Sequence, residues 1–275
     1  MAAVVVSEVA SPTPALAAPK DAARSAPVAK FVFAEKAVER AGRGSGSKWE
    51  RVSEGDQLRI GDRLRTGPLS LSRLEFPWMV ATLSPDSVLV VPVEVVLALS
   101  LESGRIDLRT DGAEIVKLRT AEAAVRGEGR VIIRRESGAT FVTALEGAFE
   151  VEGKTGRERL VGGEGTVVKA GQKPSPPEAL PQPPGELAPG SDPRYVAPGD
   201  PVLLTWRPQT KAHLQILGID SEDALIDRDV GPPPQAVEIP WVGTFRWRVS
   251  TRDDRGLEGV PSGEGVICVV AKIGK

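Results

Sequence analysis

Cysteine and histidine each occur only once in the 275-residue chain. Cys268 cannot form an intramolecular disulfide, and clusters of cysteine or histidine ligands around a metal are excluded. A Ser-His-Asp triad would need His213, which alternates with apolar neighbours in an expected strand, and the chain has no Gly-x-Ser-x-Gly motif. We interpret His213 as a solvated or hydrogen-bonded strand residue and Cys268 as a small buried hydrophobe. No catalytic residue, cofactor site or metal site is predicted, and the chain is expected not to be an enzyme.

Aromatic residues are also scarce, at 4% of the chain, and the formal net charge is only -2. Nucleic-acid binding is not expected, because there is neither a basic block nor a set of aromatic side chains on which bases could stack. No apolar run approaches the roughly 20 residues that a membrane-spanning helix needs, so we expect no transmembrane segment.

The first 28 residues are rich in alanine, proline and serine and lack any periodicity. Ala2–Val6 is apolar, and Ala15–Ala18 resembles a signal-peptidase site, but a basic start and a longer apolar core are missing. Two interpretations stay open for this segment, a disordered tail and a truncated secretory signal.

What the chain does have is valine, glycine and proline in short alternating runs. Leu69–Phe76 alternates apolar and polar side chains, and similar runs follow at 80–83, 106–108, 115–118, 131–134, 141–145 and 149–151. Glycines separate these runs, as expected for strands joined by turns. The runs at 38–40 and 49–52 enclose a Gly/Ser segment and predict a hairpin. No window keeps the spacing of an amphipathic helix, so the fold class is all-β, a sandwich or roll of short strands.

Seven prolines between Lys173 and Pro193 mark a boundary and predict an extended polyproline II linker over residues 173–192. Strand patterns resume after it, with Trp206 as a core aromatic. The predicted organisation is therefore a tail or signal at 1–28, a β domain at 29–172, the linker, and a small immunoglobulin- or fibronectin-like β-sandwich at 193–275.

Two acidic clusters, 220–223 and 253–254, are either solvated loops or calcium sites, and neither has the spacing of a calcium-binding loop. The glycines at 42–46 resemble part of a phosphate-binding loop, but the required spacing and a following helix are missing. Gly162–Gly165 is interpreted as a turn.

Arg126, Arg130, Arg134 and Arg135, with Arg105 and Arg109, give the middle of the first domain a local positive charge. Strand alternation would place several of them on one exposed face, which could contact an anionic envelope polymer or serve only for solubility. The predicted partner-contact residues are Arg126, Arg130, Arg134 and Arg135.

Three passages occur in an order that resembles the FecR domain, an extracytoplasmic module named after the ferric-citrate signalling regulator. Residues 54–67 resemble its opening "EGD.L..GD.L.TG", and residues 71–76 and 101–105 resemble its middle strands. Ala124–Gly127 with Val142–Val151 resembles "AVRGT.F.V … V.VLEG.V.V", and 161–171 resembles its last turn. The resemblance covers residues 30–172. Glu128-Gly129-Arg130 and Pro77–Val80 depart from the pattern, so a ligand surface need not be inherited.

The resemblance implies a bacterial envelope protein. Classical members are membrane-spanning anti-sigma regulators, but their cytoplasmic helical domain and membrane helix have no counterpart in this sequence. We therefore expect a periplasmic, secreted or envelope-bound binding or scaffolding protein that contacts an envelope protein, peptidoglycan or a polysaccharide. Two alternatives stay open, a signal-relay module of a FecR-type transmembrane system and a glycan hydrolase with paired carboxylates.

Overall fold

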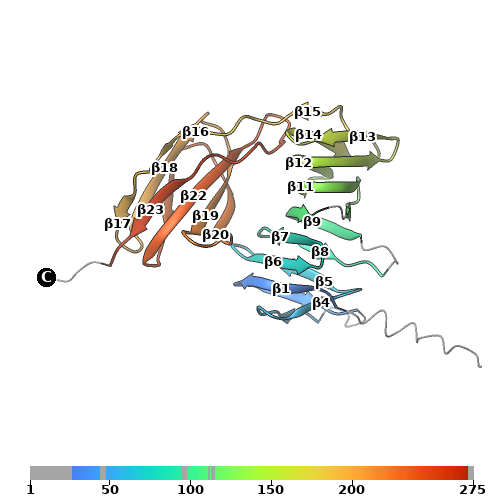
Figure 1. The fold of residues 1–275 in the computed structure, drawn as a ribbon, viewed down its shortest axis with the longest axis horizontal. Coiled ribbons are helices and arrows are strands. Elements are labelled where there is room, and N and C mark those ends of the chain that lie inside the picture. Colours follow the sequence, from blue (N-terminus) through green and yellow to red (C-terminus); the bar gives the residue numbers. More distant parts are fainter. Residues whose placement is uncertain (1–26, 44–47, 94–97, 111, 113–114, 272–275) are drawn as a thin grey trace, which may run out of the picture.

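A computed structural model describes residues 27–43, 48–93, 98–110, 112 and 115–271 of the chain (Figure 1). Every regular element in these ranges is a β-strand, which confirms the predicted all-β fold. The described residues contain no helix that could span a membrane. The tail or signal predicted for residues 1–28 lies almost entirely outside the described part, which begins with Pro27 in the first strand.

The first module is built on a 15-stranded sheet that folds over on itself. Its strands are β1 (Pro27–Glu35), β2 (Val38–Ala41), β3 (Glu50–Arg51), β4 (Gln57–Arg59), β5 (Arg63–Thr66), β6 (Leu71–Phe76), β7 (Met79–Leu83), β8 (Val88–Val90), β9 (Leu99–Thr110), β10 (Val116–Arg119), β11 (Ala124–Glu136), β12 (Ala139–Gly153), β13 (Gly156–Val161), β14 (Glu164–Lys169) and β15 (Glu178–Ala179). The predicted hairpin is present, because β2 pairs with β3. The predicted turn at Gly162 is present as well, between β13 and β14.

Three long strands, β9, β11 and β12, change partners along their length and so connect the two layers of this module. β11 pairs with β10 through Ala124–Gly127 and with β9 through Arg130–Arg135. β9 pairs with β8 through Ser100–Ser103 and then with β7 and β11 through Gly104–Thr110. β12 pairs with β14 in its first half and with β13 in its second. We had expected separate strands at 141–145 and 149–151, and this prediction is wrong. Gly147 bends the strand at a φ of 81° instead of ending it.

Gly104 marks the bend in β9. Its φ of 91° lies in the left-handed region, and a Cβ atom at this position would lie 2.5 Å from the Cα atom of Ser87. Both the conformation and the close approach therefore require glycine.

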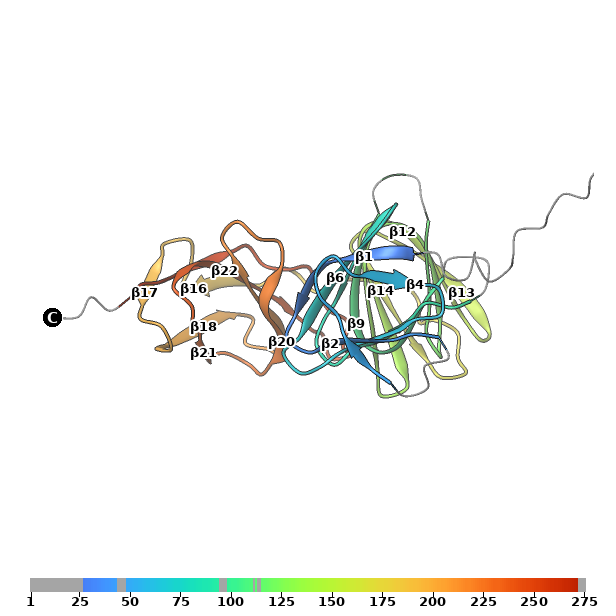
Figure 2. The same cartoon turned by 90° about the horizontal axis from the view of Figure 1, so that it is seen from below.

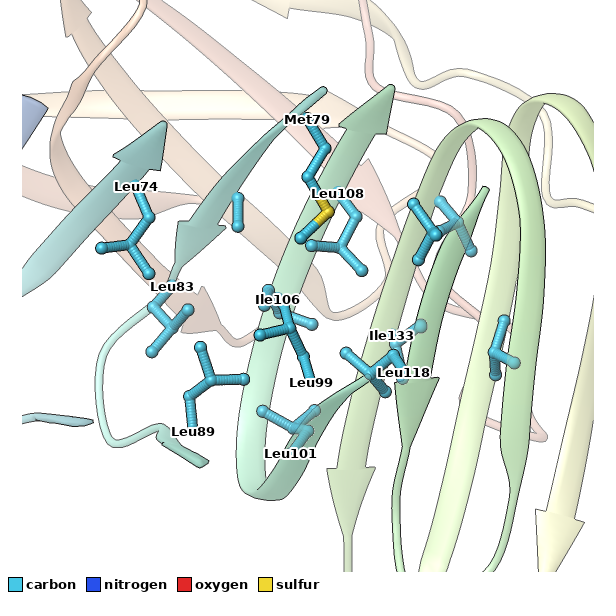
Figure 3. Packing of buried hydrophobic residues seen from close by; sticks show 14 of the residues in the cluster. Leu74, Met79, Leu83, Leu89, Leu99, Leu101, Ile106, Leu108, Leu118 and Ile133 are labelled. Carbon is cyan, nitrogen blue, oxygen red and sulfur yellow. The ribbon is translucent and has the colours of Figure 1, made fainter. Parts of the chain in front are cut away.

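The core of the first module lies between the layers. Alternate side chains of β6, β7, β9 and β11 point to one side, where Leu74, Leu83, Ile106, Leu108 and Ile133 pack together without exposed surface (Figure 3). Burying each such side chain contributes about 1.5–3 kcal/mol. The intervening positions of the same strands point outward, and on this outer face the charged residues lie.

The second module consists of a three-stranded and a five-stranded sheet (Figure 2). The first contains β16 (Gly185–Ala188), β18 (Pro201–Arg207) and β21 (Gln235–Glu238). The second contains β17 (Arg194–Val196), β19 (Ala212–Gly218), β20 (Ala224–Val230), β22 (Gly243–Thr251) and β23 (Gly265–Val269). Trp206 from the first sheet and Trp247 from the second are buried in one shared core, which confirms Trp206 as a core residue.

The proline-rich segment 173–192 contains two short strands and is packed in part, so it is not the uninterrupted polyproline II linker that the sequence predicts. β15 pairs with β14 of the first module, and the next residue, Leu180, is buried. β16 already belongs to the sheet of the second module, so this module begins before residue 193. Proline has no backbone donor and a fixed φ angle, and both are accommodated at sheet edges, so its abundance does not prevent packing there.

Cys268 is another correction. The burial pattern of β23 alternates, with Ile267 and Val269 facing the core. Cys268 lies between them, faces the opposite side and is partly exposed, with its thiol 3.6 Å from the hydroxyl of Thr244. The period of two in a strand explains the difference, since one of every two apolar residues in such a run can face outward.

Candidate functional site

Charged side chains from both modules meet in the seam between them. The seam lies where β20 of the second module approaches β6 of the first (Figure 1). On one side it is formed by the outer face of β9 and β11, where Arg105, Asp107 and Arg109 alternate with the core residues Ile106 and Leu108. On the other side it is formed by β19, β20, β22 and the segment that follows β22. The period of two in β9 thus fixes which side chains meet the second module.

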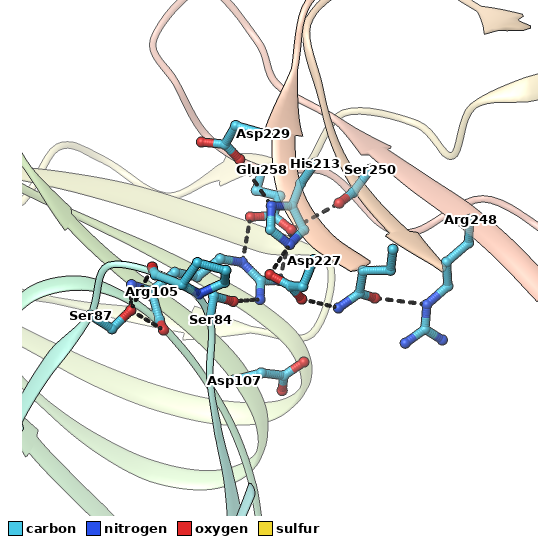
Figure 4. Close-up of polar contacts among 12 residues, drawn as sticks. Ser84, Ser87, Arg105, Asp107, His213, Asp227, Asp229, Arg248, Ser250 and Glu258 are labelled. Atoms are coloured by element: carbon cyan, nitrogen blue, oxygen red, sulfur yellow. Dashed lines mark hydrogen bonds and ion pairs between the residues drawn. The ribbon is translucent and has the colours of Figure 1, made fainter. Parts of the chain in front are cut away.

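The central contact of the seam is an ion pair between Arg105 and Glu258. The Nε and Nη2 atoms of Arg105 donate to the two carboxylate oxygens at 3.0 and 2.9 Å (Figure 4). Ser250 also donates to Glu258, at 2.8 Å, and Arg105 donates to the hydroxyl of Ser84 at 3.1 Å. Only 6% of Arg105 and 3% of Glu258 is exposed. Burial raises the pKa of Glu258, but Arg105 and His213 outweigh it and lower the pKa to about 2.

His213 lies beside this pair and is held between two aspartates. Its Nε2 atom is 3.1 Å from Oδ1 of Asp227, and its Nδ1 atom is 2.9 Å from Oδ1 of Asp229. Burial alone would lower its pKa, yet the negative charge of Asp227 and Glu258 raises it to about 9. His213 is therefore an imidazolium at neutral pH, and it balances one of the buried carboxylates.

This arrangement fixes charges in place instead of activating a nucleophile. A general base must be unprotonated at the working pH, and a histidine whose pKa is about 9 is not. Ser250 donates to Glu258 and not to His213, so the two residues do not form a serine–histidine pair. Within the described ranges no group of three or more histidine, cysteine, aspartate or glutamate side chains could hold a metal ion.

Further contacts extend the seam in both directions. Arg73 of β6 is 3.0 Å from Asp223, which belongs to one of the acidic clusters noted in the sequence. Thr143 of β12 donates to the carbonyl of Glu258 at 3.2 Å. Leu71 packs against Leu217 and Ala224 in a small apolar cluster. The modules are thus docked by ion pairs, hydrogen bonds and apolar contacts together.

An open cleft lies beside the buried pair, with a volume of about 340 Å³. We call it the arginine cleft, because five arginines and only three carboxylates line it. These charged residues are Arg73, Arg105, Arg109, Arg130, Arg248, Glu75, Asp107 and Glu222. A second cleft has a volume of about 460 Å³ and is also lined by Arg105. His213, Asp229 and Arg252 line it as well.

Gln215 links the arginine cleft to the buried charges. Its amide nitrogen donates to Oδ2 of Asp227 at 2.8 Å, and its amide oxygen accepts from Nε of Arg248 at 2.9 Å. Figure 4 shows Arg248 at the end of this chain of contacts. Asp227 and Gln215 therefore hold the guanidinium of Arg248 in place.

The four arginines predicted to form one basic face are distributed over different surroundings. Arg130 lines the arginine cleft and pairs with Asp107 at 2.8 Å, while Arg134 donates to the carbonyl of Gly256 at 2.6 Å in the seam. Arg126 lies in the other half of β11 and pairs with Glu150 at 3.2 Å. Arg135 has the opposite parity along the strand and pairs with Glu122 at 2.9 Å. Whether any of them contacts a partner remains a prediction.

Two residues of the arginine cleft escaped the sequence analysis as partner-contact residues. Arg109 follows Arg105 at the spacing of one strand face, which was a usable signal. The sequence contains no such signal for Arg248, because nothing in it places β22 opposite β9. The acidic cluster at 253–254 lies near the seam, where Asp253 pairs with Arg255 at 2.7 Å. Part of the glycine-rich segment at 42–46 lies outside the described residues.

Comparison with known proteins adds little. No protein-family profile matches the sequence. No curated protein matches it either. Among solved structures, two crystal structures of a proposed anti-sigma factor from Parabacteroides distasonis, at 1.65 and 2.50 Å resolution, align with 42% of this chain at 18% identity and a TM-score of 0.37. The alignment spans 59% of the length of those chains. A likeness at this level carries no conclusion about function.

Proposed function

We propose that the chain is a non-enzymatic binding or scaffolding protein of the bacterial cell envelope, which holds its two β modules in a fixed arrangement and contacts an envelope protein or glycan. The buried contact between Arg105 and Glu258 is the observation that carries this proposal. A charge pair with so little exposure, joining residues from different modules, gives the pair of modules one defined orientation.

The interactions of the side chains that could act in catalysis support the proposal. His213 is the single histidine of the chain, and it is paired with two aspartates. Glu258 receives three donated hydrogen bonds, two from Arg105 and one from Ser250. Groups held in this way stabilise a geometry, whereas a catalytic carboxyl or imidazole has to exchange a proton during turnover.

The envelope location rests on the sequence. The order of the passages between residues 54 and 171 resembles the FecR domain, whose members are extracytoplasmic. The proposed location is therefore the periplasm, the envelope or the exterior. Fractionation of cells that express the protein from its own gene would place it, and recovery in the cytoplasmic fraction would contradict the proposal.

A retention experiment tests the binding function. The purified chain, immobilised through its carboxyl end, is incubated with peptidoglycan sacculi and, separately, with solubilised envelope proteins. We expect selective retention of one of these, compared with an unrelated all-β protein of similar net charge. Retention of a single receptor protein would favour the relay function, and no retention at low salt from either source would contradict a binding role.

A further inference from the structure

Five arginines and three carboxylates line the arginine cleft, and the ion pairs of each arginine show which of them lack a partner. Arg105 is turned toward Glu258 and Arg73 toward Asp223, so these two are compensated by the second module. Asp107, the carboxylate in the middle of the cleft, is bound to Arg130. Two arginines of the cleft, Arg109 and Arg248, remain to be explained.

Arg109 and Arg130 face each other directly across β9 and β11. Like charges at such cross-strand positions repel and destabilise a sheet, unless an opposite charge lies between them. Arg130 has Asp107, but among the described residues no carboxylate lies within ion-pair distance of Arg109. An anionic group bound in the cleft would reduce the repulsion between Arg109 and Arg130 and so stabilise the sheet.

Arg248 approaches the same place from the second module. Its only hydrogen bond to a described residue goes from Nε to Gln215, and its guanidinium has no carboxylate within ion-pair distance in the described part of the chain. Burial, with the nearby positive charge of Arg130, lowers the pKa of Arg248, and the more distant carboxylates Asp107, Glu222 and Glu264 offset this only in part. Since Gln215 occupies Nε, the two terminal nitrogens are left as donors.

We propose that the arginine cleft binds an oxyanion, a carboxylate or phosphate group of the ligand, through Arg248 and Arg109, with Arg130 contributing to the positive field. The planar fork of a guanidinium matches both kinds of group in a bidentate way. The volume of about 340 Å³ is at the lower end of the range for small-molecule sites, so it admits a single sugar or side-chain-sized group.

This inference rests on the proposed binding function and states the chemistry that the partner must carry. Glu75 and Glu222 also line the cleft, and they limit its positive field on the side of β6 and β20. The oxyanion is therefore expected toward β9, β11 and β22, where the arginines converge.

Titration calorimetry of the full chain with D-glucuronate and with glycerol phosphate, at an ionic strength held constant with chloride, tests the proposal. The two probes separate a carboxylate ligand from a phosphate ligand. The variants are Arg109→Gln and Arg248→Gln. Arg157→Gln is the matched control, because Arg157 of β13 is an arginine of the same sheet with an exposed side chain but lies outside the cleft.

We expect saturable binding of at least one probe. Each cleft variant should weaken it at least about tenfold, the effect of losing a charge-assisted hydrogen bond, and the control should bind like the unaltered chain. Without probe, Arg109→Gln should unfold at a temperature equal to or above that of the unaltered chain, because it removes a repulsion. Loss of an ordinary structural arginine would lower that temperature.

Arg109→Gln keeps the test informative if Arg248→Gln fails to fold, since Arg109 is exposed and its side chain makes no hydrogen bond or ion pair with another described residue. Absence of saturable binding of both probes to the unaltered chain would overturn the proposal. Binding that neither cleft variant weakens would overturn it too. Retention of an envelope partner despite these results would leave the proposed binding function standing and move its site elsewhere, so the two failures are distinguishable.

Discussion

Replacing Glu258 by glutamine tests whether the ion pair with Arg105 holds the two modules together. The substitution keeps the size of the side chain but removes its charge, and one of the two oxygens that accept from Arg105 becomes a donor. Arg105, only 6% exposed, would remain as a buried cation without its counter-charge. Removal of one partner of a buried ion pair costs about 3–5 kcal/mol, so we expect the free energy of unfolding to fall by that amount.

Urea denaturation followed by tryptophan fluorescence measures this loss, since Trp206 and Trp247 report on the core of the second module. The matched control is Glu264→Gln. Glu264 pairs with Arg246 at 2.9 Å within the second module, but its side chain is 35% exposed. An exposed pair contributes at most about 1 kcal/mol, so the control should change stability little.

The single variants Arg105→Met and Glu258→Met and the double variant that combines them form a double-mutant cycle. The double variant leaves no unpaired charge, so its cost should be smaller than the sum of the two single variants. If Glu258→Gln cost no more than Glu264→Gln, the buried pair would not hold the modules together, and the basis of the proposed function would be refuted.

The remaining predictions concern pH, the bend in β9 and the apolar part of the seam. Because the pKa of His213 is raised from 6.5 to about 9, the stabilisation that its protonation provides is complete below pH 6.5 and is lost as the pH rises through 9. The free energy of unfolding, measured by urea denaturation at several pH values, should fall over that window by at most about 1.4 kcal/mol per pH unit. His213→Gln should make the free energy of unfolding depend less on pH. Gly104→Ala should destabilise the chain in urea more than Gly138→Ala, since both have a positive φ but only Gly104 lacks space for a Cβ atom; equal losses would contradict the close approach to Ser87. Leu217→Ala should cost about 2–5 kcal/mol, because Leu217 is fully buried against the first module; a loss below 1 kcal/mol in the same urea assay would mean that the apolar contact forms only weakly.

The sequence predicted the fold class because strand alternation is a local signal. Leu74–Phe76, for example, shows its inward and outward positions without any knowledge of its neighbours, whereas the apolar Leu71 lies on the outer face and packs against the second module. Glycine is a weaker signal, since the same residue can end a strand or bend it. Gly147 was therefore interpreted as a turn, although β12 continues through it with a changed partner.

The seam could not be predicted, because it depends on which faces meet. Arg105 and Glu258 are 153 positions apart, and each is a charged residue of a type that is usually exposed. Alternation correctly indicates that Arg105 points away from its own core. Only the position of the second module decides that this outward face is buried. The expectation of one basic face failed for the same reason, since Arg134 points outward but toward the other module.

The path of the chain between the modules has a consequence for how such a protein can evolve. β15 completes the first module and β16 opens the second, with five residues between Ala179 and Gly185. No stretch of sequence there is neutral with respect to both modules, so recombination at this point would bring together two surfaces that were not selected for each other. A foreign second module without a carboxylate opposite Arg105 would leave that arginine buried and unpaired. We therefore expect the two modules to be inherited as one unit, with residues 105 and 258 changing only together.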